Sequence, residues 1–551
     1  MNYPRIAVCA ASVALFVSEQ PASAAWTLSA DPIAMRALPS QWQDYFGIHY
    51  SRISTYDGPW FKTVRSYGAA NMGLPQDGSG NLNTSALTGT PMTGPFLGQS
   101  YSVALRDIHN WTFNTPGFDV VIPEALAYGL TSIYPTPNLF FLPQPVNQDL
   151  AYVTLRRVYE AFPTASSKIL FQWGNEVNAH NYDPAQTTDP TLNTTSQVPF
   201  YAGPYFARGI EALQRVSLDL YGDSQRIPVV SGSFANIRNV ASRDWMRSVL
   251  NYQITSTYAP TLAGSSIWQH VDILTVHYPF AAGEGGGAVM QAIWDEWIAP
   301  GKIPALWVTE DHGNSGLGPS TILARSMRYL DWIAGVGANA TKTRLCWWGT
   351  NDTTDPGGQA IEAINFLGRN LSGSEVRERF YSLDGAEVFL VSNGVANSLS
   401  RLTVTVLPPG AEEQNNPAIT PVDPGTITIA IPPGTLATTG PAVGVQYFTT
   451  QPSQTWTPSV SVSGQNVQIA VGRAISSPVL LTVPVSYVGP KPPVPTRMSA
   501  TAVKLDWESH AGWSYQVQYG STLTSWSSVG TPTLATGPSM TWTDDGTQTG
   551  W

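Results

Sequence analysis

The sequence predicts an α/β fold: a (β/α)8 TIM barrel, followed by a β-sandwich domain and a small C-terminal β module. The chain has 551 residues, more than one hydrophobic core usually organises, so several domains are expected. From residue 45 to about residue 373, short β-like runs alternate with longer helical patterns, which is typical of repeated β–α units around a parallel sheet. Beyond residue 373, alternating β-branched runs broken by Pro and Gly indicate antiparallel strands.

Residues 1–24 are predicted to be a cleaved secretory signal peptide. Arg5 precedes an apolar run from residue 6 to residue 17, and Ala22-Ser23-Ala24 supplies the small residues of a cleavage site. We therefore expect the protein to be secreted or otherwise extracytoplasmic. The apolar run is too short to span a bilayer and no later run is long enough, so no membrane span is expected.

Residues 25–373 are assigned to the barrel because eight candidate strands can be counted there, with helical patterns between most of them. The candidate strands are Phe46 to His49, Thr63 to Ser66, Leu130 to Tyr134, Ile169 to Trp173, Pro228 to Ser231, Ile273 to His277, Ala305 to Glu310 and Leu345 to Trp348. A doubly wound sheet would show the same alternation, but the number of units favours the barrel.

Residues 374–488 are expected to form the β-sandwich, and they should pack on the barrel because no linker precedes them. Residues 489–497, which begin Gly-Pro-Lys-Pro-Pro, are predicted to be a stiff extended linker rather than part of a sheet. Residues 498–551 are predicted to form a small fibronectin-like β module. No closing strand is evident after Met540 to Thr543, which leaves open whether this module is complete.

Composition restricts the class of partner. The formal net charge is −10 and no run of Lys or Arg occurs, which argues against nucleic acid because that partner requires a concentrated basic surface. The 19 Trp and 23 Tyr residues suit a carbohydrate, since flat aromatic rings give stiff contact area. For any single Trp, a place in the core is still the more common explanation. The oligomeric state is left open.

Polar residues end three of the predicted barrel strands. Asn175 and Glu176 follow the fourth strand, His277 and Tyr278 end the sixth, and Thr309-Glu310 ends the seventh. Reactive groups of such barrels project from the carboxyl ends of the strands. Two glutamates on the fourth and seventh strands would face each other across the barrel mouth, one as an acid and one as a carboxylate, as glycosidic bond cleavage requires. A single strand-end Glu would more often be a solvated loop residue, but the pair favours catalysis.

These residues, together with Trp347-Trp348 at the end of the eighth strand, resemble clan A of the retaining glycoside hydrolases. The resemblance covers about residues 45 to 373. It is nearest to families 39, 5 and 30, because Gly47-Ile48-His49 and the run from Trp60 to Arg65 resemble their first two strands and a β domain follows. Val177 stands where many relatives carry a Pro, so the family within the clan is left open.

The resemblance implies hydrolysis of β-glycosidic bonds with retention, without a cofactor. Glu176 would be the acid/base and Glu310 the nucleophile. The other implied roles are a hydrogen bond from Asn175 to the sugar 2-hydroxyl, control of the Glu310 charge by Tyr278 and Arg65, sugar contacts from His277 and His49, and a platform from Trp347 or Trp348. Only one of the two tryptophans can face the barrel mouth, because strand side chains alternate. A buried structural role for His277 is an equal alternative.

Other site types are disfavoured. Glu310, Asp311 and His312 are adjacent, but no His-Glu-x-x-His spacing or Cys cluster supports a metal site. No Gly-x-Ser-x-Gly elbow occurs, and the glycine-rich run from Gly283 to Gly287 lacks the Lys and Ser or Thr of a phosphate-binding loop. Cys346 is expected to be a buried strand residue. A non-catalytic carbohydrate-binding protein is the remaining alternative, although it would need neither glutamate. The sugar, the linkage and endo or exo action are left open.

Overall fold

A computed structural model describes the greater part of the chain. The described residues are 25–30, 36–49, 56–65, 72–75, 77, 82–110, 116–128, 132–134, 148–174, 176–178, 198–279, 287–312, 319–348, 359–371, 376–394, 398–410, 420–432, 434–448, 452–488, 494–497, 503–509, 514–515, 517–522, 525–528 and 530–544. The predicted signal peptide and Asn175 lie outside them. For His49 and Trp348 the backbone is described but the side chain is not.

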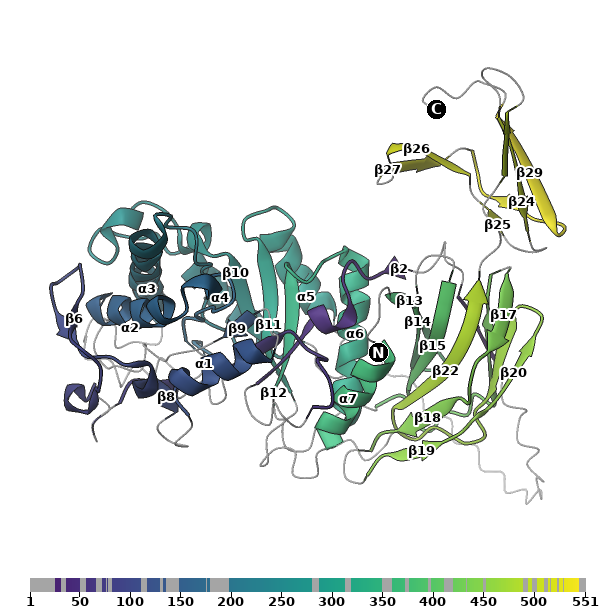
Figure 1. The fold of residues 1–551 in the computed structure, drawn as a ribbon, viewed down its shortest axis with the longest axis horizontal. Coiled ribbons are helices and arrows are strands. Elements are labelled where there is room, and N and C mark those ends of the chain that lie inside the picture. The colour runs from purple at the N-terminus through teal and green to yellow at the C-terminus, as the bar shows by residue number, and fades with distance from the viewer. Residues whose placement is uncertain are drawn as a thin grey trace, which may run out of the picture.

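Strands between residues 46 and 348 form a curled parallel sheet (Figure 1). Six strands pair in the order β10, β11, β12, β3, β4, β9. Their bounds are Phe46–His49 for β3, Thr63–Arg65 for β4, Ser132–Tyr134 for β9, Ile273–His277 for β10, Ala305–His312 for β11 and Thr343–Trp348 for β12. The other two predicted strands contribute single parallel bridges, Gln172 to Val230 and Val230 to Ile273, which continue the curl beyond β10.

Helices connect these strands and cover the outer face of the sheet. They are α1 (Phe118–Ala127), α2 (Gln148–Ala161), α3 (Val198–Tyr221), α4 (Val240–Leu250), α5 (Gly287–Ile293), α6 (Pro319–Val336) and α7 (Gln359–Leu371). Strand residues alternate between two environments. In β11, Leu306 and Val308 belong to the large core shared with the helices, whereas Ala305 and Trp307 belong to a small cluster inside the curl. Among the described residues, no helix is long and apolar enough to cross a membrane.

The chain beyond residue 376 forms two further sheets. One has the order β19, β18, β22, β15, β14, β13, β2, with β17 also paired to β22, and the other has the order β1, β16, β21, β20. The bounds are Val376–Leu383 for β13, Ala386–Asn393 for β14, Ser398–Leu407 for β15, Thr426–Ala430 for β16, Thr435–Thr438 for β17, Val443–Gln446 for β18, Gln454–Trp456 for β19, Ser459–Ser463 for β20, Asn466–Ala470 for β21 and Val479–Val488 for β22. Buried side chains of both sheets, such as Val404 and Ile429, form one core.

Two N-terminal strands belong to these sheets rather than to the curled sheet. β1 (Trp26–Ser29) pairs in parallel with β16, and β2 (Arg36–Ala37) pairs antiparallel with β13. β1 and β2, which the sequence pattern assigned to the barrel part, therefore lie with the C-terminal strands. From β1 and β2 the chain passes to the curled sheet, and it returns to the second unit at β13.

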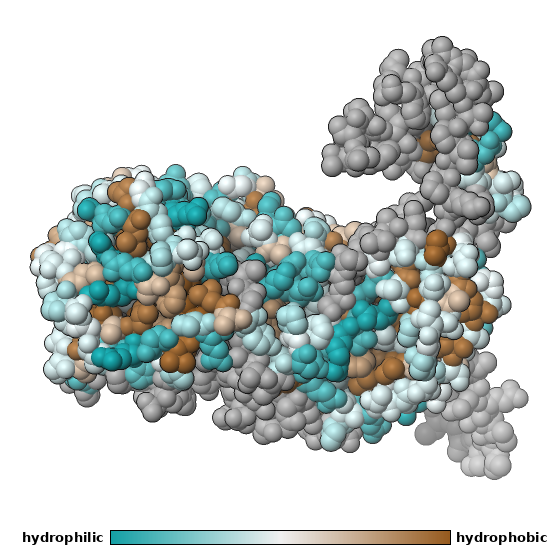
Figure 2. All heavy atoms as spheres, in the orientation of Figure 1, coloured by the Kyte–Doolittle hydropathy of each residue, from teal (hydrophilic) through white to brown (hydrophobic). Residues whose placement is uncertain are grey.

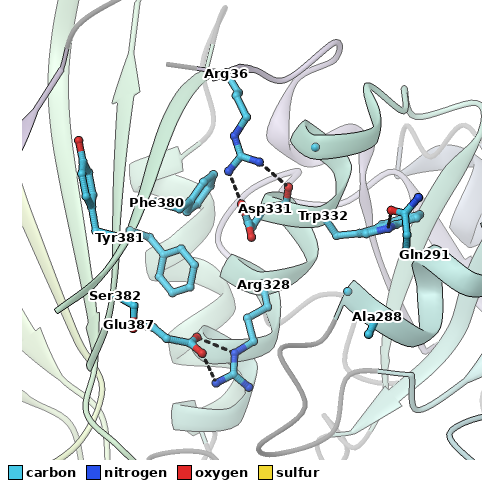
Figure 3. A pocket seen from close by; sticks show the side chains of 13 residues that line it. Arg36, Ala288, Gln291, Arg328, Asp331, Trp332, Phe380, Tyr381, Ser382 and Glu387 are labelled. Atoms are coloured by element: carbon cyan, nitrogen blue, oxygen red, sulfur yellow. Dashed lines mark hydrogen bonds and ion pairs between the residues drawn. The ribbon is translucent and has the colours of Figure 1, made fainter. Parts of the chain in front are cut away.

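The two units pack directly against each other. The guanidinium of Arg328 on α6 donates to both carboxylate oxygens of Glu387 on β14, at 2.7 and 3.0 Å. Arg36 pairs in turn with Asp331 on α6, and these contacts border a cavity of about 610 Å³ between the units (Figure 3). Phe389 of β14 belongs to the large core of the first unit. Hydrophilic residues predominate on the surface where α6 and α7 meet the antiparallel sheets (Figure 2).

The last strands form a small separate group. β23 (Val494–Arg497), β24 (Val503–Glu508) and β29 (Ser539–Asp544) make a three-stranded sheet, and β25 (Ser514–Tyr515) with β28 (Thr533–Leu534) and β26 (Gln518–Thr522) with β27 (Ser525–Ser528) make two-stranded ones. The prediction that residues 489–497 lie outside any sheet is wrong for 494–497, which pair with β24. Pro495 is tolerated because β23 is an edge strand.

Candidate active site

A β-bulge in β11 aims Glu310 into the curl. Val308 pairs with Val276 on β10, but the next pair is Glu310 with His277, so Thr309 is skipped. On the other side, Val308 pairs with Leu345 of β12 and Asp311 with Trp347. In a regular strand Thr309 and Glu310 would face opposite ways. The extra residue lets both contact the same His277 ring inside the curl, as bulges beside active sites often do.

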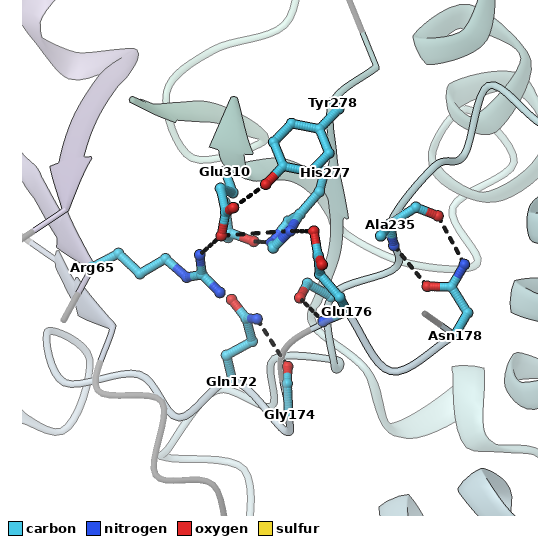
Figure 4. Close-up of polar contacts among 11 residues, drawn as sticks. Arg65, Gln172, Gly174, Glu176, Asn178, Ala235, His277, Tyr278 and Glu310 are labelled. Carbon is cyan, nitrogen blue, oxygen red and sulfur yellow. Dashed lines mark hydrogen bonds and ion pairs between the residues drawn. The ribbon is translucent and has the colours of Figure 1, made fainter. Parts of the chain in front are cut away.

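Both carboxylate oxygens of Glu310 accept hydrogen bonds, one from Arg65 and one from Tyr278 (Figure 4). Arg65, at the end of β4, donates through Nη1 to Oε2 at 2.6 Å, and its side chain is fully buried. The Tyr278 hydroxyl donates to Oε1. Burial, and then the charges of Glu310 and Glu176, raise the pKa of Tyr278 well above its usual value, so the hydroxyl keeps its proton. A buried guanidinium and a phenol donor together favour the ionised form of Glu310.

Glu176 reaches the site from a tight turn after the fourth strand. Gly174 has a φ of 90° and Glu176 a φ of 47°, a conformation that a residue with a Cβ seldom adopts. The side chain of Glu176 is buried, with 8% of its surface exposed. Its backbone N–H donates to Ser233 Oγ at 2.9 Å. The turn thus directs the carboxylate toward β10 and β11 instead of continuing along the strand (Figure 4).

His277 lies between the two glutamates. Its Nδ1 is 3.2 Å from Glu176 Oε1 and 3.6 Å from Glu310 Oε2, and its Nε2 is 3.1 Å from Thr309 Oγ1. Nδ1 thus faces both carboxylates, and Nε2 faces the Thr309 hydroxyl on the other side of the ring. The ring is fully buried. His277 therefore lies beneath the carboxylates, where it fixes their spacing.

The two glutamates are close together. One carboxylate oxygen of each, with one ring nitrogen of His277, lies within 4.8 Å of the others. Such a group could hold a divalent cation. Both oxygens of Glu310 already accept from Arg65 and Tyr278, however, and a cation there would be repelled by the Arg65 charge. Asp311 cannot complete a metal site either, since its carboxylate faces outward and pairs with Arg325 of α6.

The predicted site residues have different outcomes. The structure brings together Glu176, Glu310, Arg65, Tyr278 and His277. Asn175 and the side chains of His49 and Trp348 lie outside the described residues. Trp347 as the sugar platform is wrong, because its ring is 1% exposed in the helix-facing core and stacks on Phe46 at 6.2 Å.

Three neighbours of the site were not singled out from the sequence. Thr309 stands inside the Thr-Glu pair itself and binds His277. Ser233 follows the fifth predicted strand in Ser231-Gly232-Ser233, a polar strand end that the rule used for the other strands could have found. Asn178 pairs with Ala235, two residues after Ser233. Cys346 is buried as predicted, and burial raises the pKa of its thiol to about 12, so the thiol stays protonated.

No known protein-family model and no curated protein matches the chain. Among solved structures, it is similar to a 4-O-α-L-rhamnosyl-β-D-glucuronidase from Fusarium oxysporum, with 13% identity and a TM-score of 0.46 over 83% of this chain and 100% of that one. A bifunctional glucanase-xylanase from a metagenome library has 12% identity and a TM-score of 0.47, over 84% and 99%. An α-L-arabinofuranosidase from Thermotoga maritima has 9% identity and a TM-score of 0.41, over 77% and 87%. At such values the similarity does not identify what this chain acts on.

Proposed function

We propose that this chain is a secreted glycoside hydrolase that cleaves β-glycosidic bonds of a poly- or oligosaccharide with retention of configuration. The observation that carries the proposal is the buried pair Glu176 and Glu310, because a carboxylate oxygen of one lies within 4.8 Å of a carboxylate oxygen of the other. Retaining enzymes hold their two carboxyl groups about 5 Å apart, whereas inverting enzymes need about 8 Å to admit a water molecule. The spacing supports attack by a carboxylate rather than by water.

The surroundings of each glutamate support distinct roles. Arg65 and Tyr278 both donate to Glu310, which suits an ionised nucleophile. Glu310 would attack the anomeric carbon while Glu176 gives its proton to the departing oxygen, so the glycosidic bond breaks as an ester to Glu310 forms. Glu176, now a carboxylate, would take a proton from water, and the resulting hydroxide equivalent would displace Glu310. Two inversions at one carbon restore the starting configuration.

A binding-only protein explains this arrangement less well. Burying two carboxylates side by side is unfavourable, because each disfavours the ionisation of the other. The chain nonetheless places Glu176 and Glu310 together, the first in an unusual backbone conformation and the second on a bulge. Strain of this kind is concentrated at functional sites. A surface that only bound sugar would need neither feature.

The proposal extends to the domains. We infer that the curled parallel sheet is a (β/α)8 barrel, since the two bridges at Val230 continue it toward β9 from the other side. We further infer that the two antiparallel sheets form a β-sandwich that includes β1 and β2, and that residues 494–544 belong to a small β module. Residues 1–24 would direct export and be removed. The proposed chemistry requires no cofactor.

A substrate screen in the presence of a chelator tests the proposal. The purified protein should hydrolyse at least one of β-glucans, mannans, xylans or aryl β-glycosides, and 5 mM EDTA should change the rate by less than about twofold, because both steps use side chains alone. Reducing-sugar release measures the polymers, and nitrophenol absorbance measures the aryl glycosides. Loss of activity in EDTA that Zn²⁺ or Mn²⁺ restores would instead assign Glu176, His277 and Glu310 to a metal site.

Removal of residues 489–551 should leave the catalytic unit intact. The removed segment follows the end of β22, and its strands stand away from α1–α7 (Figure 1). We expect kcat/KM on a soluble aryl β-glycoside to stay within about twofold of the full chain, since small modules usually fold independently. A tenfold or greater loss on that substrate, with an unchanged melting temperature, would show that the module contributes to the site.

A further inference from the structure

The turn that carries Glu176 is held to a neighbouring segment on both sides of the glutamate. Before Glu176, the Ser233 N–H donates to the Gly174 carbonyl at 3.2 Å. After it, the Val177 N–H donates to the Ser233 carbonyl at 3.0 Å. At the glutamate itself, the N–H donates to Ser233 Oγ at 2.9 Å. One serine thus binds the turn through its amide, its carbonyl and its hydroxyl.

Asn178 closes the far end of this contact. Its side-chain amide donates to the Ala235 carbonyl at 2.8 Å, and its side-chain oxygen accepts from the Ala235 N–H at 2.7 Å (Figure 4). The side chain therefore takes the place of a neighbouring strand. Five hydrogen bonds between described residues join the Glu176 turn to the segment from Gly232 to Ala235.

The close approach depends on Gly232. A Cβ on this residue would lie 2.3 Å from the Trp173 carbonyl oxygen and 2.7 Å from the Phe206 ring, both shorter than any real contact. The segment can therefore reach the Glu176 turn only because residue 232 has no side chain. The same segment also binds β10, since the His277 N–H donates to the Phe234 carbonyl at 2.9 Å. The segment from Gly232 to Ala235 thus holds the backbone of both Glu176 and His277.

The hydrogen bonds from the segment between Gly232 and Ala235 compensate the energetic cost of the unusual backbone conformation of Glu176. A φ of 47° is unfavourable for a residue with a Cβ, and such a conformation persists only where the surrounding contacts hold it. The Glu176 N–H points at Ser233 Oγ in that conformation. Without the hydroxyl, a buried donor would lose its partner, and relaxation of the turn would rotate the carboxylate away from the site.

We propose that Ser233, assisted by Asn178, is a positioning residue that holds Glu176 where it can protonate the leaving group; this inference rests on the proposed function. Neither residue takes part in the chemistry. They set the position and orientation of the Glu176 carboxyl group, and a displacement of about 1 Å at such a group can lower the rate about 100-fold. Misplacement of the Glu176 carboxyl group should therefore lower kcat/KM only for substrates whose leaving group needs a proton.

The test is the Ser233→Ala variant on two aryl β-glycosides of the sugar that the wild-type protein cleaves. For a phenyl glycoside, which needs acid assistance, we expect kcat/KM to fall about 10- to 100-fold, a part of the whole contribution of general acid catalysis. For a 2,4-dinitrophenyl glycoside, which departs unprotonated, kcat/KM should stay within about threefold. The ratio of the two values is the readout, because general destabilisation would lower both alike.

Ser231→Ala is the matched control. Ser231 is also buried, but its hydroxyl contacts Thr275 of β10 and the Gly232 carbonyl rather than the Glu176 turn. Its ratio should equal that of the wild type. Asn178→Asp is a second variant, at a half-buried residue, that keeps the oxygen that accepts from the Ala235 N–H and loses the amide that donates to the Ala235 carbonyl. It should shift the ratio in the same direction as Ser233→Ala. If Ser233→Ala does not fold, Asn178→Asp alone tests the proposal.

Each outcome bears on a different claim. A changed ratio in Ser233→Ala or Asn178→Asp, with none in Ser231→Ala, supports the positioning role. If Glu176→Ala shows the leaving-group bias while the Ser233 and Asn178 variants lose both substrates equally or neither, the positioning role is overturned and the hydrolase stands. If Glu176→Ala itself shows no bias, Glu176 is not the acid and both claims fall.

Discussion

Glu310→Gln should abolish turnover, with kcat reduced by about 10⁴-fold or more, as is usual when a nucleophile is removed. The amide has nearly the shape of the carboxylate but cannot attack the anomeric carbon. The adjacent Asp311 cannot replace it, because its carboxylate faces α6 on the other side of the strand and pairs with Arg325. Steady-state rates on an aryl β-glycoside measure the effect, and activity within tenfold of wild type would remove Glu310 from the mechanism.

The same substitution should also lower stability, so a control is needed. Glu310 is the hydrogen-bonded ion partner of the fully buried Arg65, and neutralising one member of a buried pair costs about 3–5 kcal/mol. Asp311→Asn removes a carboxylate from an equally buried pair one residue away. We expect similar losses of melting temperature in the two variants, with turnover lost only in Glu310→Gln.

An added nucleophile tests the assignment of Glu310 through the configuration of the product. In Glu310→Ala, azide could enter the space that the carboxylate leaves and attack the anomeric carbon of an activated β-glycoside. One inversion would give an α-glycosyl azide. Glu176 would be dispensable in that reaction, because a dinitrophenolate departs without a proton. A β-azide from this variant would contradict the nucleophile assignment.

The fold was predictable where local pattern decides it. The apolar runs that form β3, β10 and β11 are short, and polar or helical sequence bounds each of them, so the strands begin where the pattern predicts. β1 is different. Its partner β16 is near the other end of the chain, and nothing local in Trp26–Ser29 distinguishes a strand of the second unit from one of the first. Val494–Arg497 was missed because Pro495 and the prolines just before the strand suggested a linker, whereas an edge strand accepts a Pro.

The site was predictable in its chemistry but not in its geometry. Polar strand ends identified Glu176, Glu310 and the His277-Tyr278 pair, and the resemblance implied Arg65, because side-chain type and order along the chain are sequence properties. The bulge at Thr309 is not, since it depends on how β10 and β12 pair with β11. Alternation allowed only one of Trp347 and Trp348 to face the site, and the packing of Trp347 in the hydrophobic core, which the sequence does not reveal, excludes that residue.

Glu176→Ala should produce the opposite anomer from Glu310→Ala when azide is added. Without the acid, glycosides with poor leaving groups should lose about 10²- to 10⁴-fold in kcat/KM, whereas a dinitrophenyl β-glycoside should still form the ester to Glu310. Water then has no base to activate it, so the glycosyl-enzyme should accumulate after a burst of phenol. Mass spectrometry of the intact protein would detect the added sugar.

Azide completes that second step because it needs no base. The Glu176 carboxylate is buried beside Glu310 and His277, so its removal opens space for a small anion and relieves the repulsion that a carboxylate would exert on it. Attack on the glycosyl-enzyme is the second inversion at the same carbon, so the product should be a β-glycosyl azide. NMR of the isolated azide gives the configuration. An α-azide would indicate an inverting enzyme, and wild-type rates without azide would mean that Glu176 is only a strand-end glutamate.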